Sequence, residues 1–142
     1  MTDVTIFHNP ACGTSRNTLA LLRHAGIAPN VIEYLRTPPG PDEILRLAAE
    51  IGVPLRALLR EKGTPYAELG LGDPRWSDAE LLDFIARHPI LLNRPIVRTP
   101  LGTALCRPSE VVLELLPVGP IAPFTKSDGE VVHDHGRRRT AA

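Results

Sequence analysis

Short apolar runs and one amphipathic stretch organise the amino-terminal part of the chain. Residues 4–7 (VTIF) and residues 31–35 (VIEYL) are apolar and rich in β-branched side chains, which predicts two buried strands. Between them, residues 13–25 place leucines on one helical face, and Gly26 ends that periodicity. The pattern therefore predicts a compact βαβ unit with parallel strands and a right-handed crossover.

The middle of the chain, about residues 41–88, reads as a helical block. Pro41 precedes two acidic residues, which the helix dipole favours in a first turn, and apolar residues keep helical spacing up to Gly52. Residues 55–59 predict a further short helix. Ser77 begins a capping-box pattern that predicts the last helix of the block.

The carboxyl-terminal third begins with a hairpin pattern. Residues 94–98 and residues 103–106 predict two short strands, and the TPLG sequence between them is a turn signal. A final helix is predicted to open at Pro108 and to carry apolar residues as far as Leu116. Beyond that point the periodicity fades.

The order of these elements predicts the fold class. A βαβ half and a ββα half that share one four-stranded mixed sheet, with a helical insertion between them, form the α/β plan of the thioredoxin superfamily. We expect a single domain over residues 1–124 with the insertion at about 41–88. Residues 125–142 would be a carboxyl-terminal extension, and its polar, basic end is expected to be disordered. A proline opens the third strand in this fold, often after a cis peptide, and Pro95 would take that role.

Composition and charge exclude several classes of protein. The chain has 142 residues, of which 43% are hydrophobic and 23% charged, values typical of one globular domain. The formal net charge is zero, whereas nucleic-acid binders usually carry a basic excess. No signal-peptide pattern and no membrane-length apolar stretch occur.

Two cysteines cannot form a secreted disulfide scaffold, so we expect a cytoplasmic location with free thiols. The cysteines and the five histidines lack metal-ligand spacing, so no metal site is predicted.

Cys12 is the main candidate for chemistry. It lies in the sequence HNPACGTSRNT (residues 8–18), at the start of a predicted helix. The thiol could be packed or nucleophilic, and its small, polar, turn-forming neighbours favour the nucleophile. Backbone N–H groups at a helix start and nearby cations lower a thiol pKa. The loop residues Gly13, Thr14 and Ser15 would support that helix start.

His8 has two possible readings. It could be a solvated or capped histidine of the loop. As a functional residue, it would lower the pKa of the Cys12 thiol electrostatically.

The sequence excludes three known thiol arrangements, two of them through residues of this loop. A C-x-x-C dithiol needs cysteine at position 15, which is Ser15, and a C-x5-R phosphatase loop needs arginine at position 18, which is Thr18. A relay through three cysteines is impossible with two. Cys106 lies on a predicted strand, where a structural role is favoured. A single reactive thiol must therefore obtain its reductant from another molecule.

Three arginines outside the loop lie at structural junctions, namely Arg60, Arg94 and Arg107. Each one alone could be solvated or paired with an acid. Arg94 precedes Pro95 and should face Cys12 in a thioredoxin-like fold, and Arg107 could reach the same side. Guanidinium groups suit tetrahedral oxyanions, so the three together predict an anion site beside the thiol.

Long stretches of the chain resemble the glutaredoxin-coupled arsenate reductases. The resemblance rests on HNPACGTSRNTL, PLRALLREKGTPYAELGL and HPILLNRPIVRTPLGTALCRPSEVVLELLP, within a match from about Val4 to about Phe124. It implies a thioredoxin-like fold with a helical insertion. It also implies that Cys12 is the nucleophile, that His8 helps to ionise it, and that the three arginines bind the oxyanion.

The resemblance further implies a reaction. Arsenate binds, the Cys12 thiolate attacks arsenic, glutathione and glutaredoxin supply the electrons, and arsenite leaves, with glutathione a co-substrate and no cofactor bound. Two other functions stay open. The chain could be a non-enzymatic redox or transcription regulator of the same fold, or a glutathione-dependent reductase of another substrate.

Overall fold

A computed structural model describes residues 3–118 and 120–134, and the chain divides into two compact units. The sheet unit combines the residues up to Glu33 with those from Arg94 onward. The helical unit comprises Tyr34–Asn93, so it begins before and ends after the helical block predicted at 41–88.

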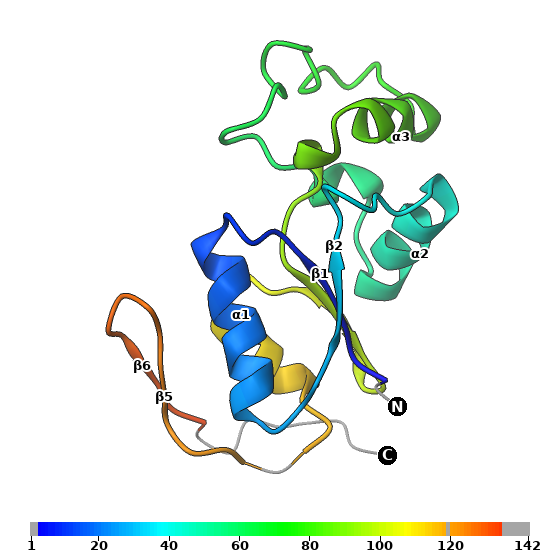
Figure 1. The fold of residues 1–142 in the computed structure, drawn as a ribbon. Helices are drawn as coiled ribbons and strands as arrows, with labels where there is room; N and C mark the ends of the chain where they lie inside the picture. Colours follow the sequence, from blue (N-terminus) through cyan, green and yellow to red (C-terminus); the bar gives the residue numbers. More distant parts are fainter. Residues whose placement is uncertain (1–2, 119, 135–142) are drawn as a thin grey trace. The chain divides into compact units, whose positions relative to one another are not determined.

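A four-stranded mixed sheet is the centre of the sheet unit (Figure 1). Its strands are β1 (Thr5–His8), β2 (Asn30–Glu33), β3 (Ile96–Thr99) and β4 (Gly102–Leu105), in the order β2-β1-β3-β4. β1 and β2 are parallel and are joined through helix α1 (Gly13–His24), whereas β3 is antiparallel to both β1 and β4. The α/β fold with one mixed sheet built from a βαβ half and a hairpin half is confirmed.

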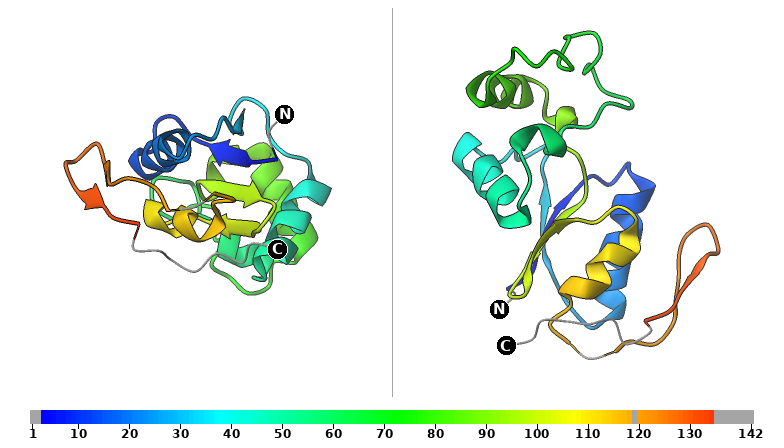
Figure 2. Two further views of the ribbon diagram at one scale, coloured as in Figure 1. Left: turned by 90° about the horizontal axis from the view of Figure 1, so that it is seen from below. Right: turned by 180° about the vertical axis from the view of Figure 1, so that it is seen from behind.

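Two helical segments cover one face of this sheet. Helix α1 and the segment η3 (Ser109–Leu115) lie side by side on it, as the views from below and behind show (Figure 2). Burying the apolar faces of α1 and η3 against the strands removes a large apolar area from water and so stabilises the unit. The core consists of Val4, Ile6, Leu19, Leu21, Leu22, Val97, Cys106, Val112, Leu113, Leu115, Leu116 and Val132.

The last predicted helix, opening at Pro108, is a 3-10 helix rather than an α-helix. Its buried residues are Ser109, Val112, Leu113 and Leu115, of which Ser109, Val112 and Leu115 are three positions apart, the period of a 3-10 helix. Apolar spacing of three and four residues predicts a helix in this segment but does not distinguish its type.

All four strands are shifted by one or two residues from their predicted bounds, and two of these shifts have a structural cause. β2 ends at Glu33, and Tyr34 instead packs fully buried in the helical unit, where its hydroxyl donates to the carbonyl of Leu92 at 3.0 Å. β3 begins at Ile96 rather than at residue 94. Pro95 has no N–H to donate to a strand ladder, which explains the late start.

The helical unit follows the predicted order of segments. It contains α2 (Pro41–Ile51), η1 (Leu55–Leu58), α3 (Asp78–Arg87) and η2 (Pro89–Leu91). The predicted capping box at Ser77 is present, because its hydroxyl accepts from the N–H of Glu80 and the Glu80 carboxylate accepts from the N–H of Ser77. The short helix predicted at 55–59 is a 3-10 helix, and η2 was not predicted.

A small hairpin that the pattern does not predict follows η3. Its strands are β5 (Phe124–Thr125) and β6 (Val131–Val132), and Gly129 takes a positive φ of 93° in the turn between them. Val132 is buried in the core of the sheet unit, so this part of the predicted extension packs against the domain. The end expected to be disordered, residues 135–142, lies outside the described residues.

Within the described parts of the chain, every helix is too short or too polar to cross a bilayer.

Candidate active site

The loop around Cys12 is held in one conformation by its own backbone. Cys12 is the N-cap of α1, and its N–H donates to the carbonyl of Asn9 at 3.0 Å. The side-chain Oδ1 of Asn9 accepts from the N–H of Ala11 at 2.9 Å, and the carbonyl of Cys12 accepts the first helical bond, from Arg16. The thiol is therefore positioned at the amino-terminal end of α1, where helical N–H groups point toward it.

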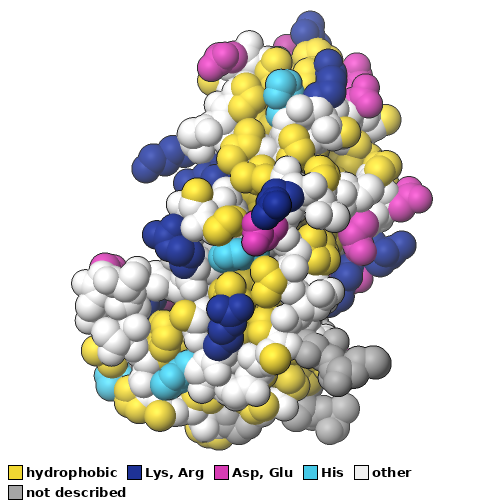
Figure 3. Space-filling model, viewed as in Figure 1, with side chains coloured by type: hydrophobic (Ala, Val, Ile, Leu, Met, Phe, Trp, Pro, Cys, Tyr) yellow, Lys and Arg dark blue, Asp and Glu magenta, His cyan; other side chains and the backbone are white. Residues whose placement is uncertain are grey.

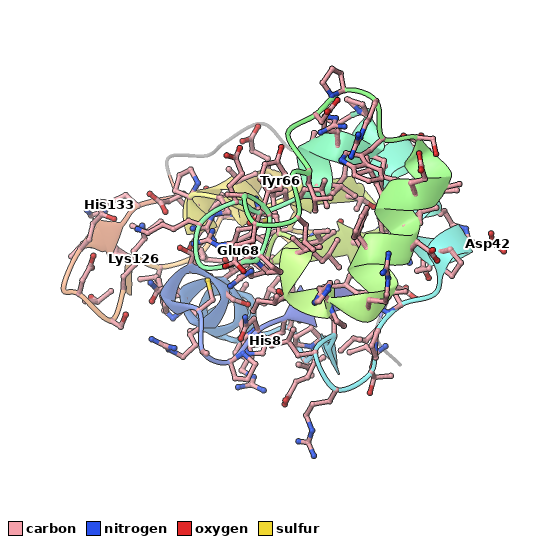
Figure 4. All side chains as sticks on the ribbon, turned by 90° about the horizontal axis from the view of Figure 1, so that it is seen from above. His8, Asp42, Tyr66, Glu68, Lys126 and His133 are labelled. Carbon is pink, nitrogen blue, oxygen red and sulfur yellow. The ribbon has the colours of Figure 1, made fainter. Side chains whose placement is uncertain are left out.

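A buried polar network underlies this loop. The Oγ of Ser15 lies 2.6 Å from Nδ1 of His8 and accepts from the N–H of Asn9 at 3.1 Å. All three residues are buried, and Ser15 is fully so. Figure 4 labels His8, which lies beside α1. Ser15 thus ties the end of β1 to the first turn of α1, below the thiol.

Two of the predicted arginines meet Cys12 in the sheet unit. The Nη1 of Arg107 lies 3.6 Å from Sγ of Cys12 and donates to the carbonyl of Arg94 at 2.8 Å. Arg94 is only 7% exposed, its side chain is close enough to lower the pKa of Cys12, and the peptide bond between Arg94 and Pro95 is cis. Behind the loop, Ser109 donates to the carbonyl of Thr14 at 3.0 Å and so joins η3 to the first turn of α1.

These contacts change the ionisation of the thiol. Partial burial raises the pKa of Cys12, but the Ser15 backbone N–H and the side chains of Arg107 and Arg94 lower it by more. The pKa of Cys12 is therefore below its ordinary value, which increases the thiolate fraction at neutral pH.

The surroundings of His8 disfavour its charged form. Burial lowers its pKa, nearby Glu33 raises it, and Arg23 and Arg16 lower it further, so that the pKa is below the ordinary histidine value. The part of His8 in lowering the pKa of Cys12 stays a prediction. The geometry favours an orienting role, in which His8 fixes Ser15 while the Ser15 N–H faces the sulfur.

Arg60 belongs to the helical unit rather than to the sheet unit that holds Cys12. There its N–H donates to the carbonyl of Leu91 at 2.7 Å, and its Nε donates to the carbonyl of Lys62 at 3.1 Å. Its part in the anion site stays a prediction.

The second cysteine, Cys106, differs from Cys12 in burial and in the direction of its pKa shift. Cys106 is fully buried, and burial raises its pKa to about 12. It packs within the core of the sheet unit. Over residues 3–118 and 120–134, no cluster of His, Cys, Asp or Glu is arranged to hold a metal ion.

Comparison with known proteins identifies the family. The ArsC family model matches residues 7–115, which cover most of the chain and include the whole Cys12 loop, Arg94 and Arg107. The chain belongs to the ArsC family.

Named relatives of this ArsC protein are similar to it along nearly their whole length. An arsenate reductase of Rhizobium meliloti is 62% identical over 136 residues, 96% of this chain and 97% of its own. An arsenate reductase of Escherichia coli is 60% identical over 139 residues, 97% of this chain and 99% of its own. Among solved structures, the arsenate reductase from Vibrio cholerae superposes with a TM-score of 0.76 at 48% identity, covering 80% of this chain and 97% of that one. The resemblance noted from the sequence is thereby confirmed at the level of the family and the fold.

One residue of the site was missed by the sequence reasoning. Asn9 accepts from Ala11, donates to Ser15 and provides the carbonyl that binds the Cys12 N–H. Asn before Pro is a turn signal that could have indicated it. Its burial, however, depends on how β1 packs against α1.

Proposed function

We propose that this protein is an arsenate reductase, which converts arsenate to arsenite with Cys12 as its nucleophile. The observation that carries the proposal is the contact between Arg107 and the Cys12 thiol at 3.6 Å, at the amino-terminal end of α1. A thiolate and a site for an oxyanion need the same positive environment, and this corner of the sheet unit supplies it. The names of the similar family members support arsenate as the substrate.

Arg107 and Arg94 would bind the oxyanion next to the sulfur, with Arg60 as a third ligand. Each guanidinium presents several N–H donors in a planar fork, which fits the oxygens of a tetrahedral anion. The bond from Arg107 to the carbonyl of Arg94 fixes one guanidinium before the anion arrives. Preorganised donors of this kind stabilise charge that develops during the reaction.

The first chemical step would form a sulfur–arsenic bond. The Cys12 thiolate attacks arsenic, and one arsenate oxygen leaves as water after protonation, which gives a thiol–arsenate adduct. A glutathione thiolate then attacks the Cys12 sulfur. A sulfur–sulfur bond forms, the sulfur–arsenic electron pair stays on arsenic, and As(V) becomes As(III), which leaves as arsenite.

The mixed disulfide between Cys12 and glutathione would be resolved by glutaredoxin. The glutaredoxin thiol attacks the glutathione sulfur and frees the Cys12 thiol, and a second glutathione reduces glutaredoxin. The net reaction consumes arsenate and two glutathione molecules and yields arsenite, glutathione disulfide and water. An external thiol is favoured because Cys106 is buried with a pKa of about 12. This dependence on glutathione agrees with a cytoplasmic location, where thiols stay reduced.

A coupled assay tests this function. Arsenate, glutathione, glutaredoxin, glutathione reductase and NADPH are mixed with the protein, and NADPH oxidation is followed. The wild type and Cys106→Ser should both give arsenate-dependent oxidation, and Cys12→Ser should give none. Oxidation that persists in Cys12→Ser would contradict the mechanism. No oxidation in the wild type would favour a regulatory role or another substrate.

A further inference from the structure

A groove of about 440 Å³ runs along α1 beside the reactive loop. It is lined by His8, Pro10, Arg16, Leu19, Ala20 and Arg23. The α1 members of this set recur at helical spacing of three and four residues, so they share one face of the helix. On the face shown in Figure 3, Lys and Arg side chains lie near hydrophobic side chains and a histidine, and an Asp or Glu side chain touches that histidine.

The lining combines positive charge with an apolar floor. Arg16 and Arg23 are exposed, and both line the groove. Leu19 and Pro10 contribute apolar surface, and the lining contains no carboxylate. Outside the lining, Glu33 is paired in register with His8 across β1 and β2, and its carboxylate raises the pKa of His8. Such a groove suits a small ligand that has carboxylates and a short apolar body.

One end of the groove adjoins the Cys12 loop. The Nη1 of Arg16 donates to the carbonyl of Pro10 at 2.9 Å, and Nη2 lies 3.7 Å from the position a Cβ on Gly13 would occupy. Arg16 therefore folds back over the loop that carries the thiol. Arg23 lies seven residues further along, a rise of about 10 Å on an α-helix. An extended tripeptide spans about the same distance, roughly 10 Å.

We propose that this groove binds glutathione through its carboxylates and holds the tripeptide beside Cys12. The inference rests on the proposed function, in which glutathione is the co-substrate. Arg23 would bind one terminal carboxylate and Arg16 the other, through guanidinium donors that do not bond Pro10. The methylene groups of the ligand would lie on Leu19 and Ala20. An acidic protein surface is the alternative ligand, but the concave shape and the volume favour the small molecule.

Binding is tested apart from catalysis with S-methylglutathione, whose sulfur cannot react. It is titrated into the full chain carrying Cys12→Ser by calorimetry, and then into the same chain carrying Arg23→Gln or Arg16→Gln. We expect the Kd to rise about five- to tenfold in each arginine variant, because one charge-assisted pair is lost. Arg46→Gln, an exposed arginine on α2 paired with Glu43, is the control and should leave the Kd unchanged. An unchanged Kd in Arg23→Gln would overturn the proposal.

A kinetic comparison distinguishes the two ligands. In the coupled assay, Arg23→Gln should raise the KM for glutathione about five- to tenfold, and Arg23→Lys should recover part of the loss. Glutathione diethyl ester, which lacks both carboxylates, should bind the wild type poorly and be less sensitive to Arg23→Gln. A rise in the KM for glutaredoxin alone would assign the groove to an acidic partner and overturn the proposal. S-methylglutathione that binds at Arg23 would support the groove even if no arsenate were reduced.

Discussion

The guanidinium of Arg107 contacts the thiol of Cys12, with Nη1 3.6 Å from Sγ. The same nitrogen donates to the carbonyl of Arg94, so its position is set by the backbone just before Pro95 rather than by the thiol. Three segments that are distant in sequence thus converge: the start of α1, the start of β3 and the end of β4. The convergence of these three segments both lowers the pKa of the Cys12 thiol and places guanidinium donors beside it.

Arg107→Gln should raise the pKa of Cys12. The variant removes a cation and a hydrogen-bond donor that favour the thiolate, while the burial that disfavours the thiolate remains. The rate of alkylation by iodoacetamide, measured against pH, should therefore reach half its maximum at a higher pH than in the wild type. Arg46→Gln in the helical unit is the control. An unshifted profile for Arg107→Gln would show that Arg107 does not tune the thiol.

Ser15→Ala should destabilise the sheet unit. The fully buried Ser15 hydroxyl bonds both His8 and the Asn9 N–H, and its loss leaves two buried polar groups without a partner. We expect the free energy of unfolding in urea to fall by about 1–3 kcal/mol. Ser127→Ala, at an exposed position of the hairpin turn, should change it by less than about 0.5 kcal/mol. Equal effects at the two positions would contradict the buried network.

Stability at mildly acidic pH should depend on His8. Burial lowers its folded pKa, so the unfolded chain binds more protons below the ordinary value of about 6.5, and stability is lost as pH falls through the folded pKa. His8→Gln loses the bond to Ser15 at every pH but cannot take up this proton. The decrease in unfolding free energy from about pH 7.5 to about pH 5.5 should therefore be smaller in the variant. An identical decrease would mean that His8 titrates normally.

Lys126 should anchor the carboxyl-terminal hairpin to η3. Its Nζ lies 2.6 Å from Glu110, and the two side chains are only 10% and 24% exposed (Lys126 is labelled in Figure 4). Lys126→Met would leave Glu110 without this cation in a partly buried place, with an expected loss of about 1–3 kcal/mol. Arg46→Met breaks an exposed pair and should cost no more than about 1 kcal/mol. Similar losses in the two variants would show that the ion pair between Lys126 and Glu110 contributes no more to stability than an exposed pair.

Local signals were sufficient for most of the fold and for the reactive cysteine. Gly13 and the leucines of residues 19–22 mark a helix start after a short strand, which places Cys12 at the N-cap of α1. The type of η3 could not be predicted, because residues spaced by three and four fit both kinds of helix. The hairpin of β5 and β6 was missed because strands of two residues carry no periodicity, although Asp128-Gly129 is a turn signal.

The site itself was only partly accessible from the sequence. The expectation that Arg94 faces Cys12 came from the fold class, since nothing local to Arg94 indicates it. Sequence reasoning left His8 as either a solvated loop residue or an electrostatic partner of the thiol, because its burial depends on packing between β1 and α1. The bonds that Asn9 makes inside the loop depend on the same packing.

The most direct test of the central claim is a single turnover without glutaredoxin, followed by intact-mass analysis. The protein is mixed with arsenate and glutathione, and both arsenite and the protein mass are measured. The account predicts one arsenite released per chain and one glutathione attached to Cys12, because glutaredoxin is needed only to resolve that disulfide. Arsenite formed while Cys12 stays unmodified, or by a chain carrying Cys12→Ser, would contradict it.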